Sequence, residues 1–175
     1  MKVGLLVSGL GFAMAATNAQ AALTTHQFIS NSVNYCQAFT PGVANTIRNR
    51  AVGAENVGTA TINLACNWHS TLGDSGTTRP QTLDIYFYNN TSASITVTCT
   101  MFNGYQTQGG SNQFLVTKPV VIAPGTQNDA FFQPSDNPNA GATDLGNYLV
   151  NINCSMPSGA VANDTYLTWT QDNGV

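Results

Sequence analysis

Charged side chains are scarce in this chain of 175 residues, where Asp, Glu, Lys and Arg together make up 7%. Glu55 is the sole glutamate, and the five basic residues are scattered along the sequence without forming a cluster. A basic patch is the electrostatic signature of nucleic-acid binding and of attachment to anionic membranes. The sequence therefore predicts neither nucleic acid nor an anionic membrane surface as a partner.

The sequence also lacks helical patterns. No window of about eleven residues beyond residue 21 keeps a helical period of apolar side chains. Lys and Glu, which populate helix surfaces, give way to 20 Asn and 22 Thr. Because Thr favours strands and Asn favours turns, the composition indicates an all-β protein.

The N-terminal residues have the pattern of a secretory signal peptide. One lysine precedes an apolar core at residues 3–16, and the small-residue A-x-A pattern that signal peptidase reads ends at Ala21. The core is too short for a transmembrane helix of about 20 residues. We predict that residues 1–21 are a signal peptide and that residues 22–175 form one secreted domain, periplasmic or extracellular, without a transmembrane segment.

The predicted mature chain has the size of one domain, 175 minus 21 or 154 residues. A chain of this length buries about 70% of the surface that its unfolded state exposes, so it can form a core without a metal. Four basic and eight acidic residues remain, which gives a net charge of −4. We expect no metal and no cofactor.

Four cysteines, an even number, favour disulfides in an exported chain. The smallest gap between them is thirty residues, which argues against a zinc site built from close cysteine pairs. Four cysteines allow three pairings, and the loop-closure entropies of these pairings differ by only about a few tenths of a kcal/mol. Entropy therefore leaves the pairing open among Cys36, Cys66, Cys99 and Cys154.

Alternation of apolar with polar residues predicts strands that have one buried face. The segments TATINLAC, ITVTCTM and LVNINC alternate in this way and place three of the cysteines on the buried faces. The predicted strands are 28–33, 47–52, 59–66, 82–88, 94–102, 113–122, 130–132, 148–154 and 166–170.

Turn-forming residues and one proline suggest how these strands are arranged. The segment NNTSA, at 89–93, predicts a hairpin between the strands on either side of it. Pro119 cannot donate to a strand ladder, so we expect its strand at a sheet edge or a bulge. No internal repeat is evident. We predict a single disulfide-stabilised β-sandwich of about eight short strands, immunoglobulin-like or jelly-roll-like.

The segment GDSG at 73–76 matches the string around the nucleophile of trypsin-like serine proteases. Such a site needs a histidine, an aspartate and then the serine, from separated parts of the chain. Only His26 and His69 precede Ser75, and His69 lies six residues away. Esterases with a GDSL signature need a later histidine, and none follows. We predict a turn in which Asp74 bonds backbone amides, and a protein that is not an enzyme.

Four oxygen-bearing side chains gather in the turn-rich segment 134–146. Pro138 and the spacing of these side chains break the pattern of a calcium-binding loop, so we expect ordinary Asx turns instead. The four residues are Asp136, Asn137, Asn139 and Asp144.

The segment LDIYFY, at 83–88, suggests a binding surface. If its aliphatic residues face the core, Tyr86 and Tyr88 stand side by side on the solvent face of a strand. Flat aromatic platforms of this kind pack against the apolar face of a sugar ring. Trp68 and Tyr105 could extend the platform. Alternatively, the tyrosines stabilise cross-strand pairs or lie under a loop.

Each cysteine has a distinctive context: NYCQAF at Cys36, NLACNW at Cys66, ITVTCTMF at Cys99 and YLVNINCSMPSG at Cys154. One short strand then closes the chain. This layout resembles a diffuse group of small exported bacterial proteins with four cysteines and no assigned activity. The resemblance implies that Cys36 pairs with Cys66 and that Cys99 pairs with Cys154.

Three functional classes follow from the sequence. The first hypothesis is a secreted, non-enzymatic structural or interaction protein, whose partner is a glycan or another surface protein and which can self-assemble. The second is a carbohydrate-binding module that uses Tyr86, Tyr88 and Trp68. The third is an enzyme, for which Ser75 would be the most visible nucleophile.

Overall fold

The computed structural model describes residues 23–39, 46–68, 78–103, 114–139, 141–146 and 150–172. The predicted signal peptide and the GDSG segment lie outside these ranges. The strands are β1 (Leu23–Asn31), β2 (Cys36–Ala38), β3 (Ile47–Arg50), β4 (Gly53–Asn56), β5 (Ile62–Asn67), β6 (Thr78–Asn89), β7 (Ile95–Asn103), β8 (Phe114–Ile122), β9 (Gln127–Phe132), β10 (Val150–Met156) and β11 (Ala160–Asp172). Short 3-10 helices are η1 (Ser32–Asn34) and η3 (Pro134–Asp136).

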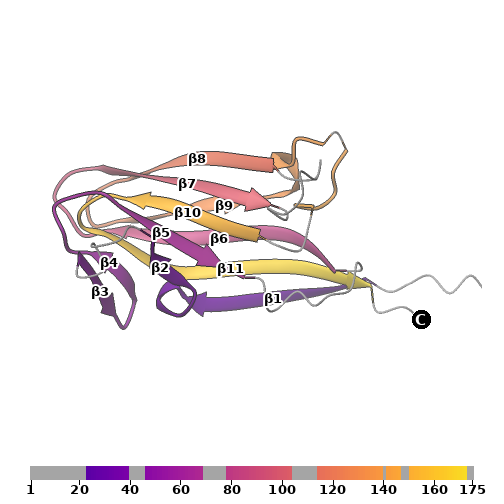
Figure 1. The fold of residues 1–175 in the computed structure, drawn as a ribbon, viewed down its shortest axis with the longest axis horizontal. Coiled ribbons are helices and arrows are strands. Elements are labelled where there is room, and N and C mark those ends of the chain that lie inside the picture. The colour runs from indigo at the N-terminus through magenta and orange to yellow at the C-terminus, as the bar shows by residue number, and fades with distance from the viewer. Residues whose placement is uncertain are drawn as a thin grey trace, which may run out of the picture.

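These strands form two antiparallel sheets that pack as two layers (Figure 1). Sheet A has the order β3-β4-β11-β6-β9, and β1 also pairs with β11. Sheet B has the order β2-β5-β10-β7-β8. The predicted all-β, disulfide-stabilised β-sandwich is confirmed. No helix in the described ranges is long and apolar enough to cross a bilayer.

The core lies between the two sheets and is built from the alternating faces that the sequence predicts. Leu83, Ile85 and Phe87 of β6 have no exposed surface, and neither do Leu64 of β5 and Ile152 of β10. Burial of such side chains contributes about 1.5–3 kcal/mol each relative to exposure. The alternation therefore fixes which face of each strand turns toward the other sheet.

Several details of the strand prediction are wrong. The strand predicted at 28–33 ends at Asn31, where η1 follows, and the short closing strand predicted at 166–170 is the 13-residue β11. The predicted strand 47–52 is the first half of a tight hairpin, because the chain reverses after Arg50 and returns as β4. The short β2, which pairs with β5, was not predicted. The strands β2, of three residues, and β3 and β4, of four residues each, are too short to show a period of apolar side chains. With them the described chain has eleven strands instead of about eight.

The segment 89–93 does not form the predicted hairpin. It carries the chain from β6 in sheet A to β7 in sheet B, so the two strands face each other across the core. Asn89 fixes this corner from a fully buried position. Its amide nitrogen donates to the carbonyl oxygens of Ala93, at 2.8 Å, and Ile122, at 3.0 Å, and its oxygen accepts from the backbone N–H of Thr91.

The same corner occurs a second time, between β4 and β5. Asn56 is also fully buried, donates to the carbonyl oxygens of Ala60 and Met156, and accepts from the backbone N–H of Gly58. Residues 56–66 read NVGTATINLAC and residues 89–99 read NNTSASITVTC. The two segments begin with the corner asparagine and end in a cysteine, at a spacing of 33 residues.

Pro119 lies where the sequence predicts it, in β8 at the edge of sheet B, paired only with β7. An edge position removes the need for a ladder hydrogen bond from the proline nitrogen. In the loop after β9, Asn137 accepts from the backbone N–H of Asn139 and Asp144 from that of Gly146, which are the expected Asx turns.

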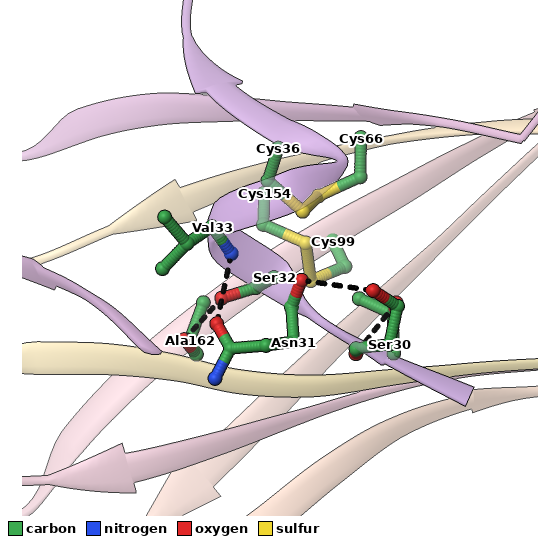
Figure 2. Close-up of a disulfide and its surroundings, with 10 residues drawn as sticks. Ser30, Asn31, Ser32, Val33, Cys36, Cys66, Cys99, Cys154 and Ala162 are labelled. Carbon is green, nitrogen blue, oxygen red and sulfur yellow. Dashed lines mark hydrogen bonds between the residues drawn. A yellow bond between two sulfur atoms is a disulfide. The ribbon is translucent and has the colours of Figure 1, made fainter. Parts of the chain in front are cut away.

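Both disulfides join neighbouring strands of sheet B. Cys36 of β2 bonds Cys66 of β5, and Cys99 of β7 bonds Cys154 of β10, the pairing that the resemblance implies. In each case the two cysteines lie directly opposite each other in the strand register. Figure 2 shows the two disulfides close together, beside the turn in which Ser32 donates to the carbonyl oxygen of Ala162.

Candidate functional site

The two sheets present outer faces of different chemical character. The outward-facing positions on the described strands of sheet B carry no charged side chain; they are Gln37, Asn63, Ala65, Asn67, Thr96, Thr98, Thr100, Phe102, Leu115, Thr117, Pro119, Val121, Asn151, Asn153 and Ser155. The outer face of sheet A instead combines tyrosines, acids and arginines. Sheet B has an exposed aromatic ring, Phe102, but no charged group beside it. Because binding sites combine aromatic surface with placed polar or charged groups, the candidate site is on sheet A.

Tyr86 and Tyr88 lie on the outer face of β6, as predicted, while Phe87 between them faces the core. Both tyrosines are half-buried. The ring of Tyr86 packs edge-to-face against Tyr166 of β11, with 5.3 Å between the ring centroids. Tyr86 is therefore part of a cross-strand aromatic pair, the alternative that the sequence left open, whereas Tyr88 lines a hollow in the same face.

The predicted role of Trp68 is wrong. Its side chain is 1% exposed and belongs to the hydrophobic core. Trp68 continues the inward phase of β5 beyond Leu64 and Cys66, so the same alternation that predicts the strand also turns this ring away from solvent. Tyr105, the other suggested addition to the platform, lies outside the described residues.

The hollow beside Tyr88 has a volume of about 310 Å³ and is lined by residues from three parts of the chain. The β3–β4 hairpin supplies two lining residues, β6 with the corner after it supplies two, and β11 supplies two. Half of this lining is polar and half is aromatic or aliphatic, which is the mixed lining of a small-ligand site. The residues are Arg50, Val52, Tyr88, Asn90, Val161 and Asn163.

Gly53 brings the hairpin against β11. A Cβ atom on this residue would overlap the carbonyl group of Ala162, and the backbone φ of 150° is one that other residues rarely adopt. On the other side, β11 changes its register with β6 between Ala162 and Thr165. This bulge lies next to Asn163, which lines the hollow, and bulges commonly redirect side chains in this way.

Glu55 organises the polar wall of the hollow from below. Its side chain is buried, and one carboxylate oxygen accepts from Nδ2 of Asn90 at 2.8 Å. The other oxygen accepts from Nε of Arg50 in an ion pair. Burial opposes ionisation, but these hydrogen bonds and the charges of Arg50 and Arg48 hold the pKa of Glu55 below its ordinary value. The carboxylate is thus charged and fixes two side chains that line the hollow.

Asn163 leaves one polar atom in the described structure without a partner. Its Oδ1 atom is buried and accepts no hydrogen bond. A buried acceptor left unpaired costs about 1–3 kcal/mol, so such atoms mark places where another donor belongs. The atom is closed off from solvent, so other parts of Asn163 form the surface of the hollow.

Asp84 and Asp129 form a pair of acids next to Tyr86. Asp84 is 8% exposed, and its Oδ1 atom has no partner among the described residues. Burial, with the nearby charge of Asp129, raises the pKa of Asp84 to about 7. The charge of Asp84, burial and the hydrogen bond that Tyr86 donates to it raise the pKa of Tyr86 to about 12. This end of the face is therefore acidic.

The remaining residues that the sequence singles out do not converge on a site. Asp136 pairs with Lys118 at 2.7 Å, and Asp144 pairs with Arg79 at 3.6 Å. Within the described ranges, no three acidic, histidine or cysteine side chains group as metal ligands would. Ser75, Asp74 and His69 lie outside the described residues.

Five of the six residues that line the hollow were missed by sequence reasoning. Arg50, Val52, Asn90, Val161 and Asn163 come from segments that pairing and a bulge bring together, and no short motif joins them. One signal was present: two arginines, Arg48 and Arg50, stand near the sole glutamate in a chain that has few charges.

No protein-family model matches this sequence, and no curated protein matches it. Among solved structures, a CBM4 carbohydrate-binding module aligns over 81% of both chains with 12% identity and a TM-score of 0.35. TmCBM61 in complex with β-1,4-galactotriose aligns over 83% of this chain and 84% of its own, with 7% identity and a TM-score of 0.35.

The agarase AgWH50C aligns over 90% of this chain but only 24% of its own, with 15% identity and a TM-score of 0.36. At TM-scores of 0.35–0.36 we take no function from these alignments. The site has to be interpreted from its own residues.

Proposed function

We propose that this is an exported, non-enzymatic binding protein that recognises a glycan in the hollow beside Tyr88. The observation that carries the proposal is the composition of that hollow, where one aromatic ring meets positioned hydrogen-bonding groups. The two disulfides support export, because such bonds persist in oxidising compartments.

A sugar ring presents an apolar face and a rim of hydroxyl groups, and the hollow offers a counterpart to each. Tyr88 provides a flat ring for the apolar face, as aromatic side chains do with ring-shaped ligands. Arg50 and Asn90 are held in place by Glu55, so little side-chain entropy is lost when they bind hydroxyl groups.

The test is a titration of the purified, oxidised protein with soluble neutral and acidic polysaccharides, followed by tyrosine fluorescence and by retardation in gels that contain the polysaccharide. We expect at least one polysaccharide to bind, and Tyr88→Ala to weaken that binding about tenfold or more, since loss of a stacked aromatic ring costs about 1–3 kcal/mol.

Phe131→Ala is the matched control. This ring is 38% exposed on the outer face of β9 but does not line the hollow, so its removal should leave binding unchanged. Absence of binding by the wild-type protein across the panel overturns the proposal. Equal losses in the two variants would also overturn it, because binding would then not depend on the hollow.

A further inference from the structure

The charges around the hollow are not balanced. The strand register places Arg48 opposite Glu55, and Arg50 opposite Gly53, on the face that also carries Tyr88. Two cations therefore stand against one carboxylate. The described ranges contain two further basic side chains, and each of these already faces its own acid, Arg79 with Asp144 and Lys118 with Asp136.

Glu55 accounts for one of the two positive charges. It is ionised, because the hydrogen bonds and charges described above outweigh its burial. Arg48, Arg50 and Glu55 together therefore carry a net charge of +1, although the mature chain as a whole has a predicted net charge of −4. A local excess of positive charge on an acidic protein selects against cationic partners and attracts anionic ones.

Arg50 is suited to bind an anionic group in this position. Its Nε atom is committed to Glu55, but the side chain remains 42% exposed, so its terminal N–H groups can reach a ligand in the hollow. The planar fork of a guanidinium matches the two oxygens of a carboxylate. Its anchoring by Glu55 fixes the direction in which that fork points.

The opposite end of the same face has the opposite sign. Beyond Tyr86 lie Asp84 and Asp129, which disfavour a second anionic group there. A polymer with a carboxylate on every sugar would meet this acidic pair as soon as it extends across the sheet. The face therefore fits a glycan whose acidic sugars are separated by neutral ones.

We infer that the hollow selects a glycan with an isolated carboxylate-bearing sugar, whose carboxylate binds Arg50 while a neutral neighbouring sugar extends toward Tyr86. The inference rests on the proposed glycan-binding function and names its ligand class. It is carried by the excess of arginine at the hairpin and by the acidic pair at the far end of the face.

The test compares each acidic polysaccharide of a panel with its carboxyl-reduced form, which keeps the same backbone and linkages but replaces every carboxylate with a neutral hydroxymethyl group. Glucuronoxylan, in which acidic sugars are sparse, and polygalacturonate, in which they are continuous, are both included with their reduced forms, next to neutral galactan and xylan. Binding is measured by affinity electrophoresis and tyrosine fluorescence with the full oxidised chain.

We expect retention of an acidic polymer with sparse carboxylates, a loss of about tenfold or more on carboxyl reduction, and weaker binding of polygalacturonate. Equal binding of an acidic polymer and its reduced form, or preference for neutral polymers, overturns the inference but leaves the proposed function standing. Stronger binding of polygalacturonate than of glucuronoxylan also overturns it. No retention of any polymer overturns the proposed function itself.

Two arginine variants locate the effect on the protein. Arg48→Gln removes an exposed charge without breaking the Arg50–Glu55 pair, so the variant should fold and show a reduced preference for the acidic form over the reduced form. Arg79→Gln removes the same charge beside Asp144, away from the hollow, and should retain the full preference. An identical decrease in both variants would mean that net charge, not the hollow, sets the preference.

Discussion

Asp84 is a buried carboxyl group whose protonation in the folded protein differs from that in the unfolded chain. Its pKa rises from the ordinary 3.8 to about 7, first because of burial and second because of Asp129. Between these two values the folded state binds more protons at this group than the unfolded state does. The free energy of unfolding therefore falls by up to about 4 kcal/mol in total as the pH rises through this window. Above the window it no longer changes with pH through this group.

We expect Asp84→Asn to remove most of this pH dependence, because an amide is neutral at every pH in the window. Urea unfolding at pH 5 and pH 8 measures the effect: the wild-type protein should lose stability between the two values, whereas the variant should change little and be the more stable at pH 8. Asp164→Asn, an acid on β11, is the control and should keep the wild-type profile. A variant with the wild-type pH dependence would contradict the assignment to Asp84.

Gly53 offers a second test at the scale of one residue. A Cβ atom there would overlap the carbonyl group of Ala162, so Gly53→Ala must push the β3–β4 hairpin away from β11. We expect a loss of about 2–4 kcal/mol in unfolding free energy and, because the hairpin lines the hollow, weaker glycan binding.

Gly141→Ala separates steric overlap from backbone strain. Gly141 also has a positive φ, 76°, but nothing lies within 4 Å of its added Cβ. Its substitution should cost only about 1 kcal/mol, as expected for the left-handed conformation alone. Equal costs at the two glycines would contradict the close approach of the hairpin to β11.

At the scale of elements, the two asparagine corners perform the same task at different places. Each ends a strand of sheet A and starts a strand of sheet B, and in each the buried amide satisfies two carbonyl groups. We expect Asn56→Ala and Asn89→Ala each to lower the unfolding free energy by about 2–4 kcal/mol, since each removes the hydrogen bonds of a fully buried amide, one of them to a buried carbonyl group.

Asn128→Ala is the control for the corner variants. Asn128 also donates to a carbonyl group, that of Val121, but does so in an exposed position where water can replace it. Chemical unfolding should show a change below about 0.5 kcal/mol. If the corner variants were equally mild, the buried amides would not hold the corners.

The sequence was informative about strands and their faces, because period-two alternation is a local property of the chain. It correctly predicted that Ile85 and Phe87 face the core and that Pro119 lies in an edge strand. It was wrong about the segment 89–93, because turn-rich residues are the same in a hairpin and in a corner between sheets. The two outcomes differ only in which strand lies alongside, and this depends on the whole chain.

The binding hollow shows the same limit at the scale of the site. The alternation pattern predicted that Tyr88 faces solvent. It could not predict that Arg50 and Asn163 lie beside Tyr88, because they are 38 and 75 residues away in the sequence. It also could not exclude Trp68, whose inward phase is visible only if the predicted strand 59–66 is extended by two residues. Long-range pairing, and not local propensity, assembles this site.

At the scale of the whole molecule, the two disulfides lie in one sheet. Removing the Cys36–Cys66 link as a double alanine variant should lower the unfolding free energy by about 3.5 kcal/mol, and removing Cys99–Cys154 by about 4 kcal/mol, because the second closes the longer loop. Urea unfolding of the two variants and of the oxidised wild-type chain tests this order. Unchanged stability in both would contradict a stabilising role.

Each disulfide also joins a cysteine to the next one along the chain. The loops follow one another without overlap, 36–66 and then 99–154. A chain that emerges from a translocation channel N-terminus first therefore meets its cysteines in the order in which they pair, and an oxidant that joins them as they appear makes no wrong bond. The protein should mature correctly in a compartment that has a thiol oxidase but lacks a disulfide isomerase.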